Sequence, residues 1–110
     1  MIIVRTTLKV FPEKQLEVIQ TLLSLIEPVG GEPGCNSCCA FCDIKDKHRL
    51  ILLEEWETQK DLDQHIKSLR FGVLLGTRTL LCEPPQIQIH TVNKTQGMET
   101  VHAIRQNKEK

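Results

Sequence analysis

A histidine and a tryptophan are the residues of this sequence best suited to do chemistry. His65 comes three residues after Leu62 and four before Leu69, so a helix would put its imidazole on or beside an apolar face. Imidazole titrates near neutrality, so it can accept a proton from a bound substrate, although an inward histidine is often only a satisfied core residue. Trp56 ends an apolar strand and can serve as a core anchor or as a wall for a flat ligand.

The cysteines are the second group that could carry chemistry. Cys35, Cys38, Cys39 and Cys42 are clustered, and the fifth is Cys82. If the cluster lies on a strand, alternation puts Cys35 and Cys39 on one face and Cys38 and Cys42 on the other, so four thiolates cannot converge on one metal ion. We therefore expect no metal and interpret these residues as small hydrophobic side chains, with thiol or metal chemistry as a third hypothesis. An odd count without a signal peptide argues against a disulfide framework.

The spacing of apolar residues predicts the elements that must position these side chains. It indicates strands at 2–11, 35–43, 48–57 and 80–92, helices at 13–27 and 59–69, and a short helical turn at 70–76. Pro28 is expected to end the first helix. Thr58 is expected to cap the second, with Asp61 three residues on. The Pro84-Pro85 pair belongs at a bulge or a sheet edge.

This order, β-α-β-β-α-β, is typical of the ferredoxin-like split βαβ fold. In this α+β architecture both helices cover one face of an antiparallel four-stranded sheet, and we assign residues 1–92 to it. The candidates for the uncovered face are Ile3, Phe41, Ile51, Leu53, Ile87 and Ile89. A second copy of the same sheet is the economical cover for that face, so we expect a homodimer.

Residues 93–110 form a polar C-terminal tail. Met98, Val101 and Ile104 could give this tail one amphipathic face and dock it as a short helix. The last residues, 107–110, are expected to be disordered.

Composition limits the classes of function. The chain has 110 residues, which implies one domain, and its 14 basic residues balance its 14 acidic ones. Such a chain has no overall field to attract nucleic acid or an anionic membrane, so we expect neither as a partner. No apolar run approaches the ~18 residues that a membrane span needs, and the N-terminus does not read as a signal peptide. A cytoplasmic location is the default expectation.

Three stretches of the sequence resemble the antibiotic biosynthesis monooxygenase domain family. They are Val10-Phe11-Pro12-Glu13-Lys14, then Glu32-Pro33-Gly34-Cys35, and finally Glu54-Glu55-Trp56-Glu57-Thr58-Gln59 through Leu62, His65 and Phe71. The resemblance runs over about residues 1–92 and implies a dimeric α+β barrel. Family members studied as enzymes oxidise phenols or quinols with molecular oxygen and use neither a metal nor an organic cofactor. Many members have no known activity, so the resemblance implies the fold more strongly than the reaction.

The sequence departs from the haem-degrading members of that family. Those members use an Asn on the first strand, a Trp at the end of the third strand and a His after the second helix. Trp56 matches the second of these, but Thr6 and Leu75 occupy the other two positions, which disfavours haem degradation. Tyr, on which the polyketide-type enzymes partly rely, is absent, and Cys38-Cys39 stands where the second strand usually carries an aromatic–acidic pair.

The residues and the resemblance together predict a cofactor-independent monooxygenase that acts on a quinol or other phenolic small molecule. In this hypothesis His65 accepts the substrate proton, Trp56 and Phe71 form apolar walls, and Thr6 supplies a hydrogen bond. The site would lie between the sheet and the second helix. The alternative hypothesis is a non-catalytic dimeric module that binds a small ligand, which the missing catalytic residues and the scarcity of aromatic residues favour.

Overall fold

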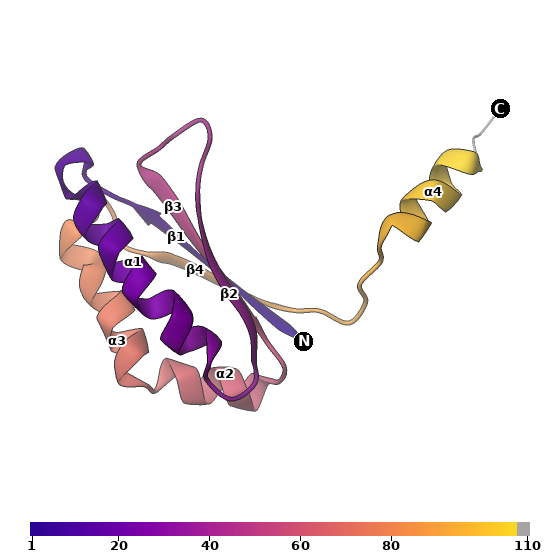
Figure 1. Cartoon of the computed structure of the whole chain (residues 1–110), viewed down its shortest axis with the longest axis horizontal. Coiled ribbons are helices and arrows are strands. Elements are labelled where there is room, and N and C mark those ends of the chain that lie inside the picture. The colour runs from indigo at the N-terminus through magenta and orange to yellow at the C-terminus, as the bar shows by residue number, and fades with distance from the viewer. Residues whose placement is uncertain (108–110) are drawn as a thin grey trace.

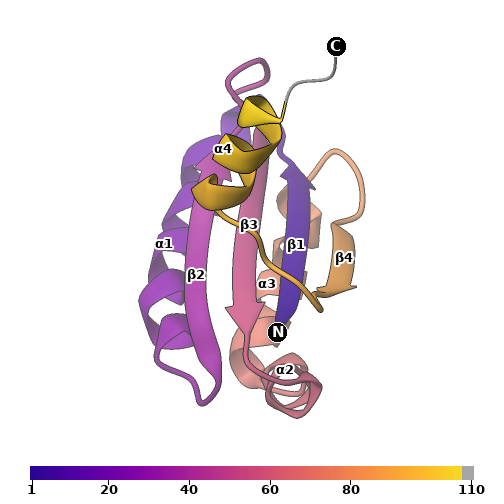
Figure 2. The same ribbon diagram turned by 90° about the vertical axis from the view of Figure 1, so that its right-hand side faces the viewer.

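The computed structural model describes residues 1–107 and shows a four-stranded antiparallel sheet with helices packed on one face. The strands are β1 (Ile2–Lys9), β2 (Cys35–Cys42), β3 (Arg49–Trp56) and β4 (Gln86–Thr91). Their order across the sheet is β2-β3-β1-β4, and each neighbouring pair is antiparallel (Figure 2). The predicted α+β ferredoxin-like fold is confirmed.

Three helices cover the sheet and a fourth stands apart from it. The helices are α1 (Gln15–Gly30), α2 (Gln59–Ile66), α3 (Leu69–Gly76) and α4 (Met98–Gln106), with 3-10 turns at Pro12–Lys14 and Thr77–Leu80. Figure 1 shows α1, α2 and α3 on one side of the sheet and α4 on the other, at the end of an extended connection. Within residues 1–107, no helix combines the length and apolar character needed to cross a membrane.

The C-terminal tail forms a helix, as the sequence indicates, but this helix is not docked on its own domain. No residue of α4 is buried. Of the segment expected to be disordered, residues 108–110 lie outside the described residues.

The core lies between the sheet and the three covering helices. Inward positions of β1 and β3 alternate with outward ones, as the period of two requires. The most buried apolar side chains from the strands are Ile2, Val4, Leu8, Leu50, Leu52 and Trp56, and those from the helices are Val18, Leu22, Leu25, Val29, Leu62, Phe71 and Leu74. Full burial of one such side chain stabilises the fold by ~1.5–3 kcal/mol, so this layer holds α1, α2 and α3 in place.

Two predicted boundaries are wrong because proline acts differently from what we expected. The first helix continues past Pro28 to Gly30. A proline in the last turn removes one backbone hydrogen bond, whereas Val29, 4% exposed, anchors that turn in the core. The strand predicted at 80–92 begins only at Gln86, because a 3-10 turn and the Pro84-Pro85 pair precede it.

The helix predicted at 59–69 ends earlier, at Ile66, and the helical turn predicted at 70–76 is a helix that begins at Leu69. Thr58 caps α2 as expected, because its hydroxyl oxygen accepts a hydrogen bond from the backbone N–H of Asp61 at 3.1 Å. Ser68 then caps α3 through its own hydroxyl, which ends the first helix and starts the next. Ile66 and Leu69, which we expected to face inward, are 38% and 90% exposed because the break rotates them away from the sheet.

The register of β4 corrects one set of predicted outward residues. Ile87 and Ile89 pair with Thr6 and Val4, which point toward the helices, so both isoleucines lie on the covered face at its edge. The central outward-facing residues are Cys39 and Phe41 of β2, Ile51 and Leu53 of β3, Ile3, Arg5 and Thr7 of β1, and Gln86, Gln88 and His90 of β4. This uncovered face is therefore apolar toward β2 and polar toward β4.

The loop between α1 and β2 is tightly packed around a glycine. Gly34 has a φ of +80°, its carbonyl accepts a 2.7 Å hydrogen bond from the N–H of Glu57, and a Cβ there would collide with Asp61. We expect Gly34→Ala to lower the free energy of unfolding by at least ~1–2 kcal/mol, the usual cost of an L-residue in this backbone region.

The matched control for that substitution is Gly72→Ala, within α3, where an added Cβ meets no atom within 4 Å. This variant should gain ~0.5–1 kcal/mol because alanine favours a helix interior over glycine. Urea unfolding of both variants measures the difference, and equal midpoints would contradict our account of the loop.

Candidate functional site

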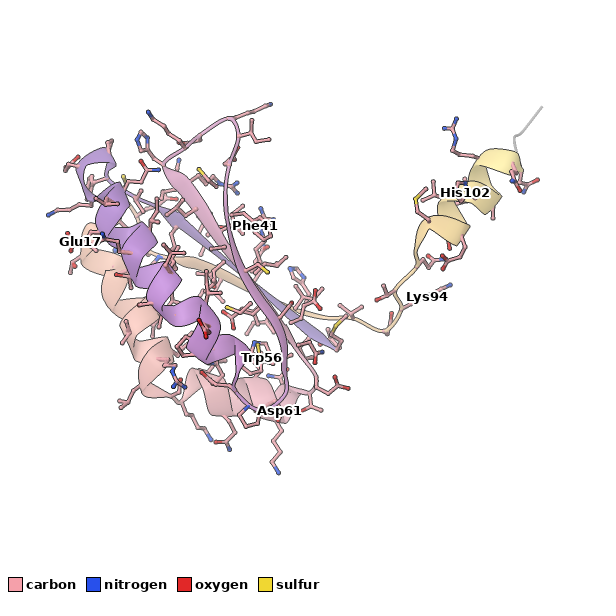
Figure 3. All side chains as sticks on the ribbon, in the orientation of Figure 1. Glu17, Phe41, Trp56, Asp61, Lys94 and His102 are labelled. Atoms are coloured by element: carbon pink, nitrogen blue, oxygen red, sulfur yellow. The ribbon has the colours of Figure 1, made fainter. Side chains whose placement is uncertain are left out.

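The end of β3 and the last turn of α2 bring an imidazole against an indole. Trp56 faces inward because it shares strand parity with Leu50 and Leu52, and it is fully buried. The ring of His65 stacks on it with centroids 4.7 Å apart and an interplanar angle of 27°. Phe71 of α3 meets the same imidazole edge-on at 5.5 Å. Three of the four predicted site residues therefore form one cluster, near the end of the sheet where Figure 3 labels Trp56.

Both nitrogen atoms of His65 face carboxyl groups. Nδ1 lies 3.0 Å from Glu32 Oε1, and Nε2 lies 3.4 Å from Glu54 Oε1. The indole N–H of Trp56 donates a 2.9 Å hydrogen bond to the same oxygen of Glu54. A neutral imidazole can donate from one nitrogen and accept at the other, so one ionised and one protonated carboxyl satisfy both contacts.

Burial sets the protonation of Glu54. Its side chain is 1% exposed, and loss of water around it raises the pKa of this carboxyl above the ordinary 4.5. The hydrogen bond from Trp56 and the charge of His65 act in the opposite direction but do not cancel the effect. Glu54 Oε2 has no hydrogen-bond partner among the described residues, which is typical of a carboxyl that holds a proton rather than a charge.

Thr6 does not join this cluster directly. It faces inward on β1 with no exposed surface, opposite Leu52 of β3, while Glu54 lies opposite Val4 one pleat away. Its hydroxyl also lacks a partner within residues 1–107. The structure thus places two unpaired polar atoms, Thr6 Oγ1 and Glu54 Oε2, on the same inward face of the sheet.

A surface cleft lies beside the buried cluster. It has a volume of about 700 Å³ and is lined by Leu23, Ser24, Glu27, Pro28, Gly31, Glu32, Pro33 and Arg70. Arg70 reaches across to Glu32, with Nη1 3.4 Å from Oε2. Glu32 therefore touches the cleft with one side and His65 with the other, and it connects the two.

The geometry separates the three clustered site residues, His65, Trp56 and Phe71, from the cleft. Trp56 and Phe71 do not line the cleft, and they are 0% and 8% exposed. His65 is 2% exposed, whereas the Glu32 side chain is 13% exposed. A molecule in the cleft meets Glu32 first and reaches His65 only through it.

Sequence reasoning missed the two carboxyl groups. It correctly separated Glu54 from Glu55 because neighbours on a strand point to opposite faces. The contacts of Glu54, which shares its face with Leu50, Leu52 and Trp56, were not predicted. A carboxyl at an inward strand position needs a partner, and that requirement was the signal available. Glu32 carried no such signal, because it lies 33 residues before His65.

The cysteines of β2 are arranged differently from the prediction. A bulge between Cys35 and Ser37 pairs Cys35 with Trp56, so Cys35 shares the inward face with Cys38 instead of joining Cys39 outside. Burial, helped by the nearby Glu54, raises the pKa of the Cys38 thiol to about 12, so this thiol stays protonated and unreactive. All five cysteines are free, and within residues 1–107 no group of three His, Cys, Asp or Glu side chains is arranged so that it could hold a metal ion.

The fold and the cluster define a ferredoxin-like α+β protein with a buried carboxyl–imidazole–carboxyl array at the end of the sheet. Sequence comparison then assigns the chain to a protein family. A family model described as antibiotic biosynthesis monooxygenase matches residues 1–73, and the chain belongs to this family.

Individual proteins and solved structures also resemble this chain in sequence or in fold. The chain is 31% identical over 98 residues to the uncharacterized protein sll1783 of Synechocystis, a match that covers 88% of this chain and 67% of that protein. It is 32% identical to a conserved protein of Methanosarcina mazei, with a TM-score of 0.77 over 81% of this chain and 89% of the other. Rv0793 of Mycobacterium tuberculosis shares the fold at 20% identity, with a TM-score of 0.80 over 87% and 98% of the two chains.

The raised pKa of Glu54 predicts how the stability of the fold depends on pH. Because the folded state raises this pKa, the stability gained from the protonated carboxyl is complete below pH 4.5 and is lost as the pH rises through the raised value. Glu54→Gln mimics the protonated group and does not titrate. Its free energy of unfolding should therefore fall less steeply than that of the wild type as the pH rises from about 5 to 8.

Urea unfolding at a series of pH values measures this slope. Glu55→Gln is the control, because it removes a carboxylate from the opposite face of the same strand. Parallel curves for the wild type and Glu54→Gln would mean that Glu54 does not hold its proton in the folded state.

Proposed function

We propose that this protein is a cofactor-independent monooxygenase that acts on a quinol or other phenolic small molecule. The observation that carries the proposal is the hydrogen-bonded pair of Glu32 and His65, which joins a 700 Å³ cleft to a buried base. Membership of the antibiotic biosynthesis monooxygenase family supports this reaction class, and the pair supplies the kind of group that such a reaction needs.

Proton removal is the step for which the protein must supply a group. A phenol transfers an electron to oxygen readily only after its hydroxyl has lost a proton. A hydroxyl bound beside Glu32 would release its proton to that carboxylate, and His65, which lies behind Glu32, would share the proton with it. Burial of this pair keeps bulk water from competing for the proton.

The overall reaction balances without a further reductant. A quinol gives up four electrons: its two hydroxyl groups become carbonyls, and one ring C–H becomes C–OH. Molecular oxygen accepts these four electrons, with one oxygen atom entering the ring and the other leaving as water. The products are a hydroxyquinone and water.

The cleft suits a small aromatic molecule with a polar end. Leu23, Pro28 and Pro33 offer apolar contacts for a ring, while Glu32 and Arg70 offer an acceptor and a donor at one side. In this scheme Trp56 and Phe71 hold the imidazole in place instead of touching the substrate. Thr6 would supply a hydrogen bond from its buried position on β1.

Oxygen uptake by the metal-stripped protein with a panel of hydroquinones and naphthols tests the proposal. We expect uptake that depends on the protein, and His65→Ala should lower kcat by about 10²–10⁴-fold with a smaller effect on KM, as the loss of a general base does. Glu32→Gln should also lower kcat and provides a second variant if the His65 cavity destabilises the fold. His48→Ala, in the loop before β3, is the control and should keep wild-type turnover.

A second candidate function is a non-catalytic module that binds a small ligand. The complete burial of Trp56 and the 2% exposure of His65 favour it, because a closed aromatic cluster stabilises a fold without contacting a substrate. In that case ligands would bind in the cleft and Arg70→Ala would weaken them, while no substrate of the panel would consume oxygen.

Assembly as a homodimer through the uncovered sheet face is part of the proposal. Phe41, Ile51 and Leu53 give that face an apolar half, and Phe41 is 51% exposed in the single chain. A second copy turned by a two-fold axis would cover this half with the same residues. We also propose a cytoplasmic location, since five free cysteines suit a reducing compartment.

A further inference from the structure

The detached helix α4 has an apolar face with nothing to cover it. Met98, Val101 and Ile104 fall on one side of the helix and are 61%, 44% and 68% exposed. A helix of nine residues is marginal in water by itself, because too few hydrogen bonds offset the cost of nucleation. This helix therefore needs a surface to pack against. Figure 3 labels His102 on α4 and Lys94 on its connection, both far from the sheet.

The folded domain has an apolar groove that matches the apolar face of α4. It lies between α1 and the outer edge of β2, has a volume of about 200 Å³, and is lined by Ile19, Leu22, Leu23, Ala40, Phe41, Cys42 and Leu50. All seven residues are apolar, so the groove matches the face of α4 in chemistry. β2 is an edge strand, so no further strand of the chain covers this side.

The connection is too short for α4 to reach this groove easily within one chain. β4 lies at the opposite edge from β2, and Thr91 ends at the end of the sheet marked by Trp56, six residues along β3 from Leu50. Three strand spacings and six residues separate the two points by about 25 Å along the diagonal. The seven Cα–Cα steps from Thr91 to Met98 span at most ~25 Å, so α4 could approach its own groove only with this connection fully extended across the uncovered face.

We infer that α4 docks in the α1–β2 groove of a second copy of this chain, and that the two copies exchange these helices reciprocally. The inference rests on the pairing of uncovered sheet faces proposed above. Figures 1 and 2 show α4 in front of the uncovered face, on the side from which a second copy would approach. The balanced charge of the chain gives no reason to expect a nucleic acid or an anionic membrane instead.

The size of the sheet face supports the exchange. Four strands of six to eight residues, spaced about 4.8 Å apart, present roughly 400 Å² per copy. A stable interface buries about 800 Å² per partner, so the flat face alone supplies about half of that area. Each copy would add both its own helix and its own groove to the contact, which brings the interface toward the usual size.

The first test changes the apolar face of α4. The double variant Val101→Asp with Ile104→Asp should raise the dissociation constant of the dimer at least tenfold, measured by sedimentation over a concentration series. Ala103→Asp is the matched control, because it adds a carboxylate on the opposite side of the same helix and should leave the dimer intact. A double variant that dimerises like the wild type would overturn the inference.

The native cysteines report where α4 binds. Cys42 lines the groove, Cys39 lies on the uncovered face, and Cys82 is exposed outside both and serves as the reference. In the wild-type dimer Cys42 should react with a maleimide at least tenfold more slowly than Cys82, and in the double variant this protection should disappear. Protection of Cys39 without protection of Cys42 would show paired sheets without docking of α4. Protection of Cys42 in the monomer would show that α4 folds back on its own chain. Either result overturns the exchange, and neither bears on oxygen uptake.

Discussion

The burial of one carboxyl group governs the arrangement around it. Glu54 sits at an inward position of β3, where its neighbours on the same face are aliphatic or aromatic. A polar group in such a place destabilises the fold unless it finds partners or gives up its charge, and Glu54 does both. The indole N–H of Trp56 and the imidazole of His65 are those partners, so the side chain fixes the orientation of two rings and the position of α2. Glu32 then completes the array from outside and brings it into contact with the cleft.

The two faces of the sheet differ in what they contact, as the sequence indicated. The inward face of the sheet builds a core whose ionisable component is the array around His65, with the hydroxyl of Thr6 buried nearby. The outward face carries no helix of the domain, and its apolar half lies toward β2. The site and the surface available for assembly therefore lie on opposite sides of the same sheet. Residues next to each other on β3, such as Glu54 and Glu55, belong to different parts of the molecule.

Short-range sequence patterns correctly predicted the features that depend on neighbouring residues. The alternation in β1 and β3 gave the strands and their inward faces, and the hydroxyl of Thr58 marked the start of α2 correctly. His65 was correctly placed inside, although one of the two neighbours used for that prediction, Leu69, is exposed because Ser68 starts a new helix. Predictions failed where one extra residue interrupted the alternation of a strand, as the bulge between Cys35 and Ser37 did for the face of Cys35. Glu32 could not be found from local sequence, since only the folded chain brings it to His65.

Gly34 connects the stability of the domain with the precision of the site. It lies two residues after Glu32, and its carbonyl binds the N–H of Glu57 just before α2 begins. The missing side chain lets the first turn of α2 approach through Asp61, and the same helix carries His65 in its last turn. Glycine also makes the unfolded chain more flexible, which lowers stability. The chain therefore retains an entropic penalty at one position to keep Glu32 and His65 within contact distance. Substitutions at Gly34 cannot raise the thermal stability of the domain without disturbing that contact.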